Sequence, residues 1–284
     1  MKKIAFLLIH CAVFFAPAHQ AFAQEKMPVL NVPTEHEGLP NDYDFDVSGF
    51  KLLDTIAETD QKFSAYPSKS NRFAVDDNGV IGLRDNRGNQ ASFLRGRTYA
   101  GGTVNQSPIE MIDIQYTSPL NDSRVMSISR HVNFEEEVSK ESLVRNVKEK
   151  YGDNPTLIMD SNYSLEFRYI FHNGELTPYV GGLQEIYNNE ITKKCQYTSN
   201  EVPVGSSRTR YRFQEHRKKK YDGCNGEVKI IMIYGSRKDL FNGLRVSMWD
   251  YDLSHKDLHD QDMFLMEALD AERSGKVGKE APKL

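Results

Sequence analysis

The chain has 284 residues, of which 39% are hydrophobic and 27% charged, a composition typical of a globular protein with room for one large domain or two small ones. Its 36 basic and 40 acidic side chains give a net charge of −4, which excludes a general affinity for nucleic acid or anionic membrane surfaces. After residue 23 there is no apolar run of about 18 residues, so no transmembrane segment is predicted.

The first 23 residues have the three parts of an export signal. Lys2 and Lys3 make a positive start, residues 4–15 are mostly apolar, and residues 21–23 (Ala-Phe-Ala) form a small-x-small cleavage site. The apolar run is too short to span a bilayer with ease. The short dilysine start is typical of bacteria, so we expect a soluble protein of the periplasm.

Cleavage of this signal would leave two of the three cysteines, because Cys11 lies inside it. Two cysteines in an oxidising compartment usually pair with each other. A redox-active pair would favour Cys-x-x-Cys spacing, which this chain lacks. We therefore predict a structural disulfide between Cys195 and Cys224.

Composition divides the rest of the chain into candidate units. Residues 24–42 contain three prolines and little periodicity, which predicts a disordered leader. Residues 43–152 are predicted to form a first α+β module. Residues 153–273 would form a second, β-rich module with a C-terminal helix, and residues 274–284 a flexible tail.

The first module begins with a predicted short helix over residues 52–63. Residues 73–75 and 80–83 flank an Asp-Asp-Asn-Gly turn, which predicts a hairpin because glycine after asparagine tolerates positive φ. A second hairpin is predicted between residues 109–117 and the strand that starts at Val125.

The clearest pattern is a strand that leads into a helix. Apolar residues recur with a period near two over residues 125–134, as in a half-buried strand. After a short acidic break, Ser139 can cap a helix that ends at Gly152, where a positive φ is expected. The helix has one apolar face, formed by Leu143, Val147 and Tyr151.

The remainder of the chain is mainly β in pattern. Strands are predicted at residues 157–159, 165–171, 182–187 and 244–251. Residues 210–216 and 228–234 are predicted to pair with each other as a hairpin. The last helix is expected to start near Ser254, with Leu253 and Leu258 as a hydrophobic staple.

These elements predict an α+β fold in which antiparallel sheets carry a few helices on one face. The order of a helix followed by antiparallel strands occurs twice, which suggests two helix–sheet modules divided near residue 152. We find no sequence repeat between the two halves.

A basic cluster is the most distinctive polar feature of the second half. It consists of Arg208, Arg210, Arg212, Arg217, Lys218, Lys219 and Lys220. Such a cluster could bind anions, namely the phosphates or sulfates of envelope glycolipids, or an acidic partner protein. The commoner role of such charge is to solvate a strand edge and block edge-to-edge pairing, so both readings stay open.

Two histidines, His255 and His259, are spaced i, i+4 on the predicted last helix, a spacing that can hold a transition metal. The zinc-protease pattern requires glutamate directly after the first histidine, where this chain has Lys256. A metal site at these residues is one hypothesis, and ordinary exposed polar residues at a helix start are the alternative.

No catalytic motif is present in the sequence. Gly-x-Ser-x-Gly, Ser-x-x-Lys and P-loop patterns are all missing, and no cofactor is predicted. His131 and His172 belong to no nucleophile motif. Carboxylates are plentiful, but a single sequence does not separate a catalytic pair from exposed acids.

Three segments resemble a family of exported proteobacterial proteins. They are residues 46–52 (Asp-Val-Ser-Gly-Phe-Lys-Leu), residues 124–130 (Arg-Val-Met-Ser-Ile-Ser-Arg) and residues 150–155 (Lys-Tyr-Gly-Asp-Asn-Pro). The family has a Gly-Met-Ser/Thr ending before its first helix, where this chain has residues 53–55 (Leu-Asp-Thr). The resemblance implies a periplasmic α+β protein and carries no catalytic residues.

The element order is also similar to the helix–sheet modules of β-lactamase-inhibitory proteins and of small outer-membrane assembly lipoproteins, at the level of fold only. The expected function is therefore non-catalytic: a periplasmic protein that binds another envelope protein or an anionic envelope component. The alternative is a hydrolase of envelope polymers whose carboxylate or metal site the sequence does not locate.

Overall fold

The computed structural model describes residues 45–66, 73–76, 80–84, 90–101, 109–181, 189, 191, 195, 223–257 and 260–261. The helices are α1 (Ile56–Ser64) and α2 (Lys140–Tyr151), with a 3₁₀ turn η1 (Pro119–Asn121). The strands are β1 (Phe73–Asp76), β2 (Val80–Arg84), β3 (Gln90–Leu94), β4 (Gly96–Gly101), β5 (Glu110–Tyr116), β6 (Val125–Ser139), β7 (Leu157–Asp160), β8 (Ser164–His172), β9 (Glu175–Leu176), β10 (Cys224–Tyr234) and β11 (Leu240–Asp250).

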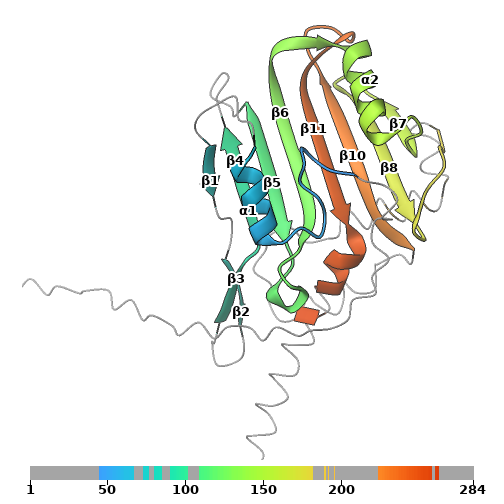
Figure 1. Cartoon of the computed structure of the whole chain (residues 1–284). Coiled ribbons are helices and arrows are strands. Elements are labelled where there is room, and N and C mark those ends of the chain that lie inside the picture. Colours follow the sequence, from blue (N-terminus) through green and yellow to red (C-terminus); the bar gives the residue numbers. More distant parts are fainter. Residues whose placement is uncertain are drawn as a thin grey trace, which may run out of the picture.

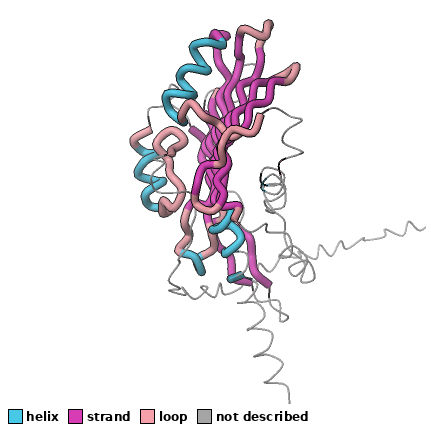
Figure 2. The backbone as a smooth tube through the Cα atoms, turned by 90° about the vertical axis from the view of Figure 1, so that its right-hand side faces the viewer, coloured by secondary structure: helices cyan, strands magenta, loops and turns pink. Residues whose placement is uncertain are grey.

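One large antiparallel sheet organises these elements (Figure 1). Hydrogen-bonded neighbours follow the order β1-β4-β5-β6-β11-β10-β8-β7, β9 pairs with β8, and β2 and β3 form a separate two-stranded sheet. Helices α1 and α2 lie on the same side of the large sheet (Figure 2). The predicted α+β class, with helices on one face of an antiparallel sheet, is confirmed.

The core lies between this sheet and the two helices. Its sheet side is built from alternate residues of the central strands, such as Ile112, Ile128 and Ile230, each fully buried. Its helix side includes Leu143 and Val147 of α2. The alternation of apolar and polar residues along each strand is what assigns one face of the sheet to this core.

The predicted strand-to-helix element is confirmed with one correction. The side chain of Ser139 caps α2 by accepting a hydrogen bond from the Ser142 N–H, and Gly152 has φ of 96°. The predicted acidic break is wrong, because β6 continues through the glutamates at 135–137 as far as Ser139. Pairing with β5 ends at Val132, so these exposed charges lie on a free length of strand, where charge opposes edge pairing.

The predicted hairpin between residues 73–75 and 80–83 is wrong. β1 pairs with β4 in the large sheet, whereas β2 pairs with β3 across residues 85–89. Both turns carry glycine after a polar residue, so local chemistry did not distinguish the hairpin turn from the connection between two sheets. The second predicted hairpin, β5 with β6, is confirmed.

Two corrections concern the second half. Both sides of β10 are taken, one by β8 and the other by β11, so the predicted pairing of residues 228–234 with residues 210–216 is wrong. Residues 182–187 and 210–216 lie outside the described residues. The last helix begins at residue 251, earlier than predicted, because the Asp250 side chain accepts a hydrogen bond from the Leu253 N–H at 2.8 Å.

The two halves of the chain contribute to the same sheet. β6, from the first half, pairs with β11, from the second, over residues 127–139 and 240–249. The domain boundary near residue 152 stays a prediction, and a continuous hydrogen-bonded ladder crosses it. In the described part of the chain, no helix combines the length and apolarity that crossing a bilayer requires.

Candidate functional site

One side of the large sheet faces away from α1 and α2 (Figure 2). We call it the polar face. Successive side chains of a strand point to opposite faces, so the residues between the buried core positions lie here. On the four central strands they include Asp113, Ser129, His131, Lys229, Arg245 and Ser247. The polar face is the candidate functional site.

Cross-strand register places four of these side chains in a block of two by two. Arg245 of β11 is directly opposite His131 of β6, and Ser247 is directly opposite Ser129. Lys229 of β10 lies on the other side of Ser247. The polar face therefore presents hydroxyl and cationic groups at its centre, on rigid strands rather than on loops.

An ion cluster lies beside this block on β8 and β10. Arg168 Nε is 2.5 Å from Glu166 Oε1, and Arg168 Nη1 is 3.8 Å from Glu227 Oε2. Lys229 Nζ is 3.5 Å from Glu166 Oε1, which closes a group of two acids and two bases. Burial lowers the pKa of Arg168, but the combined effect of Glu227 and Glu166 is larger, so the pKa is raised overall. The cluster is thus internally neutralised.

The surroundings of His131 disfavour its protonated form. Burial lowers the pKa of its imidazole, the nearby Arg245 guanidinium lowers it further, and a hydrogen bond with Asn133 opposes them. Its Nε2 atom is buried and has no hydrogen-bond partner in the structure described. Any anion that arrived near Arg245 would favour the protonated imidazole, so this pair can couple charge to binding.

A second, smaller core covers one end of the polar face. Leu157, Ile170 and Tyr251 pack there with the bonded cysteines, and Trp249 lies against them. Cys195 and Cys224 are joined with a Cα–Cα distance of 5.4 Å, and both are fully buried. The predicted disulfide is confirmed, and it links the segment at residue 195 to the first residue of β10.

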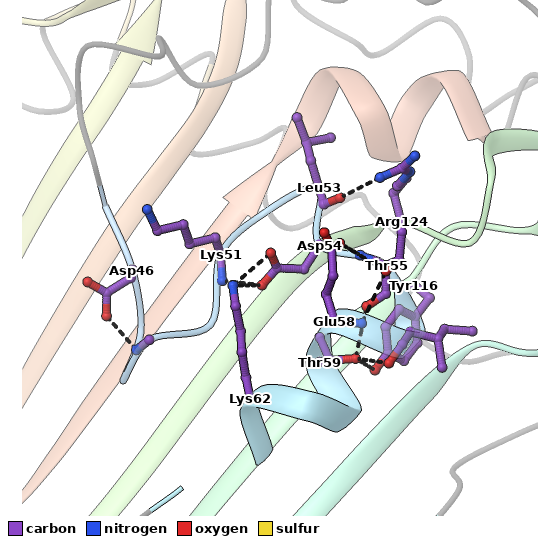
Figure 3. Close-up of polar contacts among 12 residues, drawn as sticks. Asp46, Lys51, Leu53, Asp54, Thr55, Glu58, Thr59, Lys62, Tyr116 and Arg124 are labelled. Atoms are coloured by element: carbon purple, nitrogen blue, oxygen red, sulfur yellow. Dashed lines mark hydrogen bonds and ion pairs between the residues drawn. The ribbon is translucent and has the colours of Figure 1, made fainter. Parts of the chain in front are cut away.

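On the opposite side, polar contacts fix the start of α1 (Figure 3). Lys62 Nζ lies 2.6 Å from Asp54 Oδ2, and the Val125 N–H donates to the Asp54 carbonyl at 2.8 Å. Thr55 and Glu58 form a capping box: the Glu58 N–H donates to Thr55 Oγ1 at 3.1 Å, and the Thr55 N–H donates to Glu58 Oε2 at 2.7 Å. These contacts anchor α1 on the core.

Thr55→Ala should lower the free energy of unfolding by about 1 to 2 kcal/mol, because it removes the hydroxyl that accepts from the Glu58 N–H and donates to Glu58 Oε2 at 2.9 Å. The hydrogen bond from the backbone N–H of residue 55 to Glu58 Oε2 is kept. Ser139→Ala, at the start of α2, is the matched control. It removes a single 3.3 Å hydrogen bond and should cost less than Thr55→Ala. Urea denaturation of both variants measures the difference, and a larger loss in Ser139→Ala would contradict the assignment.

The last helix is attached to the β5–β6 connection by a buried carboxylate. Asp257 Oδ1 accepts from the Ser118 N–H at 2.9 Å, from the Ser118 hydroxyl at 2.5 Å and from Asn121 Nδ2 at 3.1 Å. Asp257 Oδ2 accepts from Gln261 Nε2 at 2.5 Å. We call this set of hydrogen bonds the Asp257 clip. Its role is structural, because each hydrogen bond holds the last helix together or attaches it to the β5–β6 connection.

The sites predicted from sequence fall largely outside the described residues. This holds for Arg208, Arg210, Arg212, Arg217, Lys218, Lys219 and Lys220, and for His259. His255 is described and half-buried on the last helix. Among the residues that the structure describes, no group of three or more His, Cys, Asp or Glu side chains could hold a metal ion. Anion binding by the basic cluster and metal binding by the histidine pair therefore stay predictions.

The polar face itself was not predicted, although its signal is present in the sequence. Along β11, Arg245 and Ser247 alternate with the buried Val246 and Met248. Alternation predicts which residues share a face, but not which strands become neighbours. Only the pairing of β6 with β11 shows that His131 and Arg245 are opposite each other.

No family model, no curated protein and no solved structure matches this chain. The geometry of the described residues is therefore the basis on which a function is inferred.

Proposed function

We propose that this chain is an exported periplasmic protein without catalytic activity, which binds an envelope protein or an anionic envelope component through the polar face of its sheet. The observation that carries the proposal is the exposed guanidinium of Arg245 at the centre of that face. It makes no ion pair within the described part of the chain, whereas Arg168 on the same face is paired with two carboxylates.

The backbone of a central strand is fixed by hydrogen-bonded neighbours on both sides. Binding at Arg245 therefore requires one side chain to be ordered and no loop. Arginine is also enriched among the residues that dominate binding energies, because its planar fork suits carboxylate and phosphate groups. The core-facing side of the same strands is already filled by α1 and α2.

Arg245→Glu should weaken capture of the partner at least about tenfold, as expected for the loss of a central arginine. Arg145→Glu is the matched control, because Arg145 is an exposed arginine of α2 whose side chain is 67% accessible. Immobilised wild-type protein and both variants would be exposed to periplasmic and envelope extracts, and the bound material quantified by mass spectrometry. Equal capture by all three proteins would contradict the proposal.

The hydrolase alternative is not favoured by the acids that the structure brings together. Glu166 and Glu227 converge on one arginine, and Lys229 approaches Glu166 as well. A catalytic acid and base must both face the substrate, whereas these two carboxylates face basic side chains of the same cluster. Turnover of a purified envelope polymer by the protein would overturn this conclusion and the proposal with it.

A further inference from the structure

The central block of the polar face has more hydrogen-bond donors than the protein uses. The hydroxyls of Ser129 and Ser247, and the guanidinium of Arg245, make no hydrogen bond or ion pair with any residue that the structure describes. Elsewhere in the sheet, cations are paired: Arg130 Nε, for example, lies 2.5 Å from Glu110 Oε1. These three unused donors are neighbours on the paired strands β6 and β11.

Sheet geometry sets the size of the group that these donors could hold. Directly opposite side chains on antiparallel strands have Cβ atoms about 5 Å apart, and alternate residues on one strand are about 7 Å apart. Ser129, Ser247 and Arg245 therefore surround a space suited to one small group. The arginine fork and the two hydroxyls can together donate to three or more acceptor oxygens.

This donor count distinguishes between anions. A carboxylate has two oxygens, which the guanidinium fork alone can satisfy. A phosphate or sulfate group has further oxygens directed toward the two hydroxyls. We propose that Arg245, Ser129 and Ser247 form a binding site for a phosphate or sulfate group, and that this group is what the partner of the polar face presents. The inference extends the proposed function and depends on it only for the identity of the molecule that carries the phosphate or sulfate group.

The charges around the site are mixed, and each has an expected effect. His131 belongs to the block and favours an anion when it is protonated. Lys229 lies beside Ser247 and also favours an anion, although Glu166 Oε1 is 3.5 Å from its Nζ and offsets part of its charge. Asp113 of β5 opposes it from beside Ser129, although its carboxylate accepts a hydrogen bond from Thr98 Oγ1 at 2.5 Å. Asp113→Asn should therefore increase the affinity for the anion.

Titration of the purified full-length protein with inorganic phosphate, followed by NMR, tests the site directly. We expect saturable shifts at Ser129, His131 and Ser247 with a Kd on the order of 1 mM, since a few charge-assisted hydrogen bonds suffice for that affinity. Arg245→Gln should abolish the shifts, Arg245→Lys should weaken binding several-fold, and Arg145→Gln should leave it unchanged. Non-saturating shifts, or equal affinity in Arg245→Gln, would overturn the inference.

The pH dependence gives a second readout, with sulfate as the probe because its charge is constant across this range. An anion beside Arg245 favours protonated His131, so sulfate should bind more tightly at pH 5.5 than at pH 8, and His131→Gln should remove the difference. His131 faces Met111 and Asp113 on β5 and Gly243, Arg245 and Ser247 on β11. Tighter binding at pH 8 would contradict the site.

The source of the group is distinguished by vesicles. Binding to phosphatidylglycerol vesicles but not to phosphatidylcholine vesicles, with loss in Arg245→Gln, assigns a lipid headgroup. Binding of inorganic phosphate without vesicle binding assigns a soluble or protein-borne phosphate. If neither phosphate nor sulfate binds while Arg245→Glu still abolishes partner capture, the proposed function survives and the oxyanion inference fails.

Discussion

Replacing both Cys195 and Cys224 with alanine should lower the free energy of unfolding by about 3.5 kcal/mol. The disulfide spans a sequence separation of 29 residues, and its loss frees that loop in the unfolded chain. Both sulfurs lie in the small core on the polar face, beside Leu157, Ile170 and Tyr251. A loss of this size is a large fraction of the net stability of an ordinary domain.

Urea denaturation of wild-type protein, both single variants and the double variant separates the crosslink from side-chain packing. If the crosslink dominates, all three variants should lose a similar free energy of unfolding. The denaturant slope m should also rise, because an unfolded chain without the crosslink exposes more surface. A double variant that loses about twice as much as each single one would instead indicate packing. Two free thiols in exported wild-type protein would contradict the disulfide itself.

Asp257→Ala should be at least as damaging, with a loss of about 3 to 5 kcal/mol. The substitution leaves the Ser118 hydroxyl and the Gln261 amide without their acceptor in a site where Asp257 is only 3% exposed. The Asn121 amide loses one of its two acceptors and keeps Asp260 Oδ2 at 3.0 Å. Each buried donor that loses its partner costs about 1 to 3 kcal/mol. The last helix should detach from the β5–β6 connection before the large sheet unfolds.

Asp257→Asn is the matched control. Asparagine keeps one acceptor oxygen for Ser118 and Asn121, and the Gln261 amide can rotate to present its own oxygen to the new NH₂ group. The loss should therefore be roughly half that of Asp257→Ala. Equal losses in the two variants would show that the hydrogen bonds of the Asp257 clip contribute little.

The same pair predicts a pH dependence. Burial raises the pKa of Asp257, against the hydrogen bonds from Ser118, Asn121 and Gln261 that favour the carboxylate. A raised pKa in the folded state means that the folded protein binds the proton more tightly, so this contribution to stability is lost as pH rises through the folded pKa. The difference in free energy of unfolding between wild type and Asp257→Asn should therefore be smaller at pH 8 than at pH 4. Urea denaturation at both pH values measures it. A larger deficit at pH 8 would reverse the assigned direction.

Sequence patterns predicted the elements that depend on interactions between residues close together in the chain. Ser139, Leu143 and Gly152 predicted α2, because a cap, an apolar face and a positive φ all act within a few residues. The disulfide was predicted because only two cysteines follow the predicted export signal, and two cysteines in an oxidising compartment usually pair. The half-buried character of β6 followed from alternation alone.

Pairing between distant strands was not accessible in this way. The turn between β1 and β2 has hairpin chemistry, yet the two strands belong to different sheets. β10 was assigned one partner from its nearest neighbour, whereas β8 and β11 take its two sides. Backbone hydrogen bonds are the same for every residue type, so register depends on which apolar faces can be buried together.

Asp257 shows the same division at the scale of one side chain. In the sequence it lies between His255 and His259, the two predicted metal ligands, and no neighbouring residue indicates that it is buried. Its partners Ser118 and Asn121 are about 140 residues earlier in the chain, and only folding brings them within hydrogen-bond distance. A buried carboxylate can be identified from the hydrogen-bond donors that surround it, and here most of those donors are distant in the sequence.

The amino-acid sequence by itself determined the α+β class, the capped helix α2 and the pairing of the last two cysteines, because each depends on short-range propensity, composition or counting. The tertiary structure alone decided that β6 and β11 are neighbours, and hence that Arg245, His131, Ser129 and Ser247 form one block on the polar face. The physical reason is that a binding site depends on the distances between side chains, and those distances are set by the burial of the opposite face of the sheet against α1 and α2.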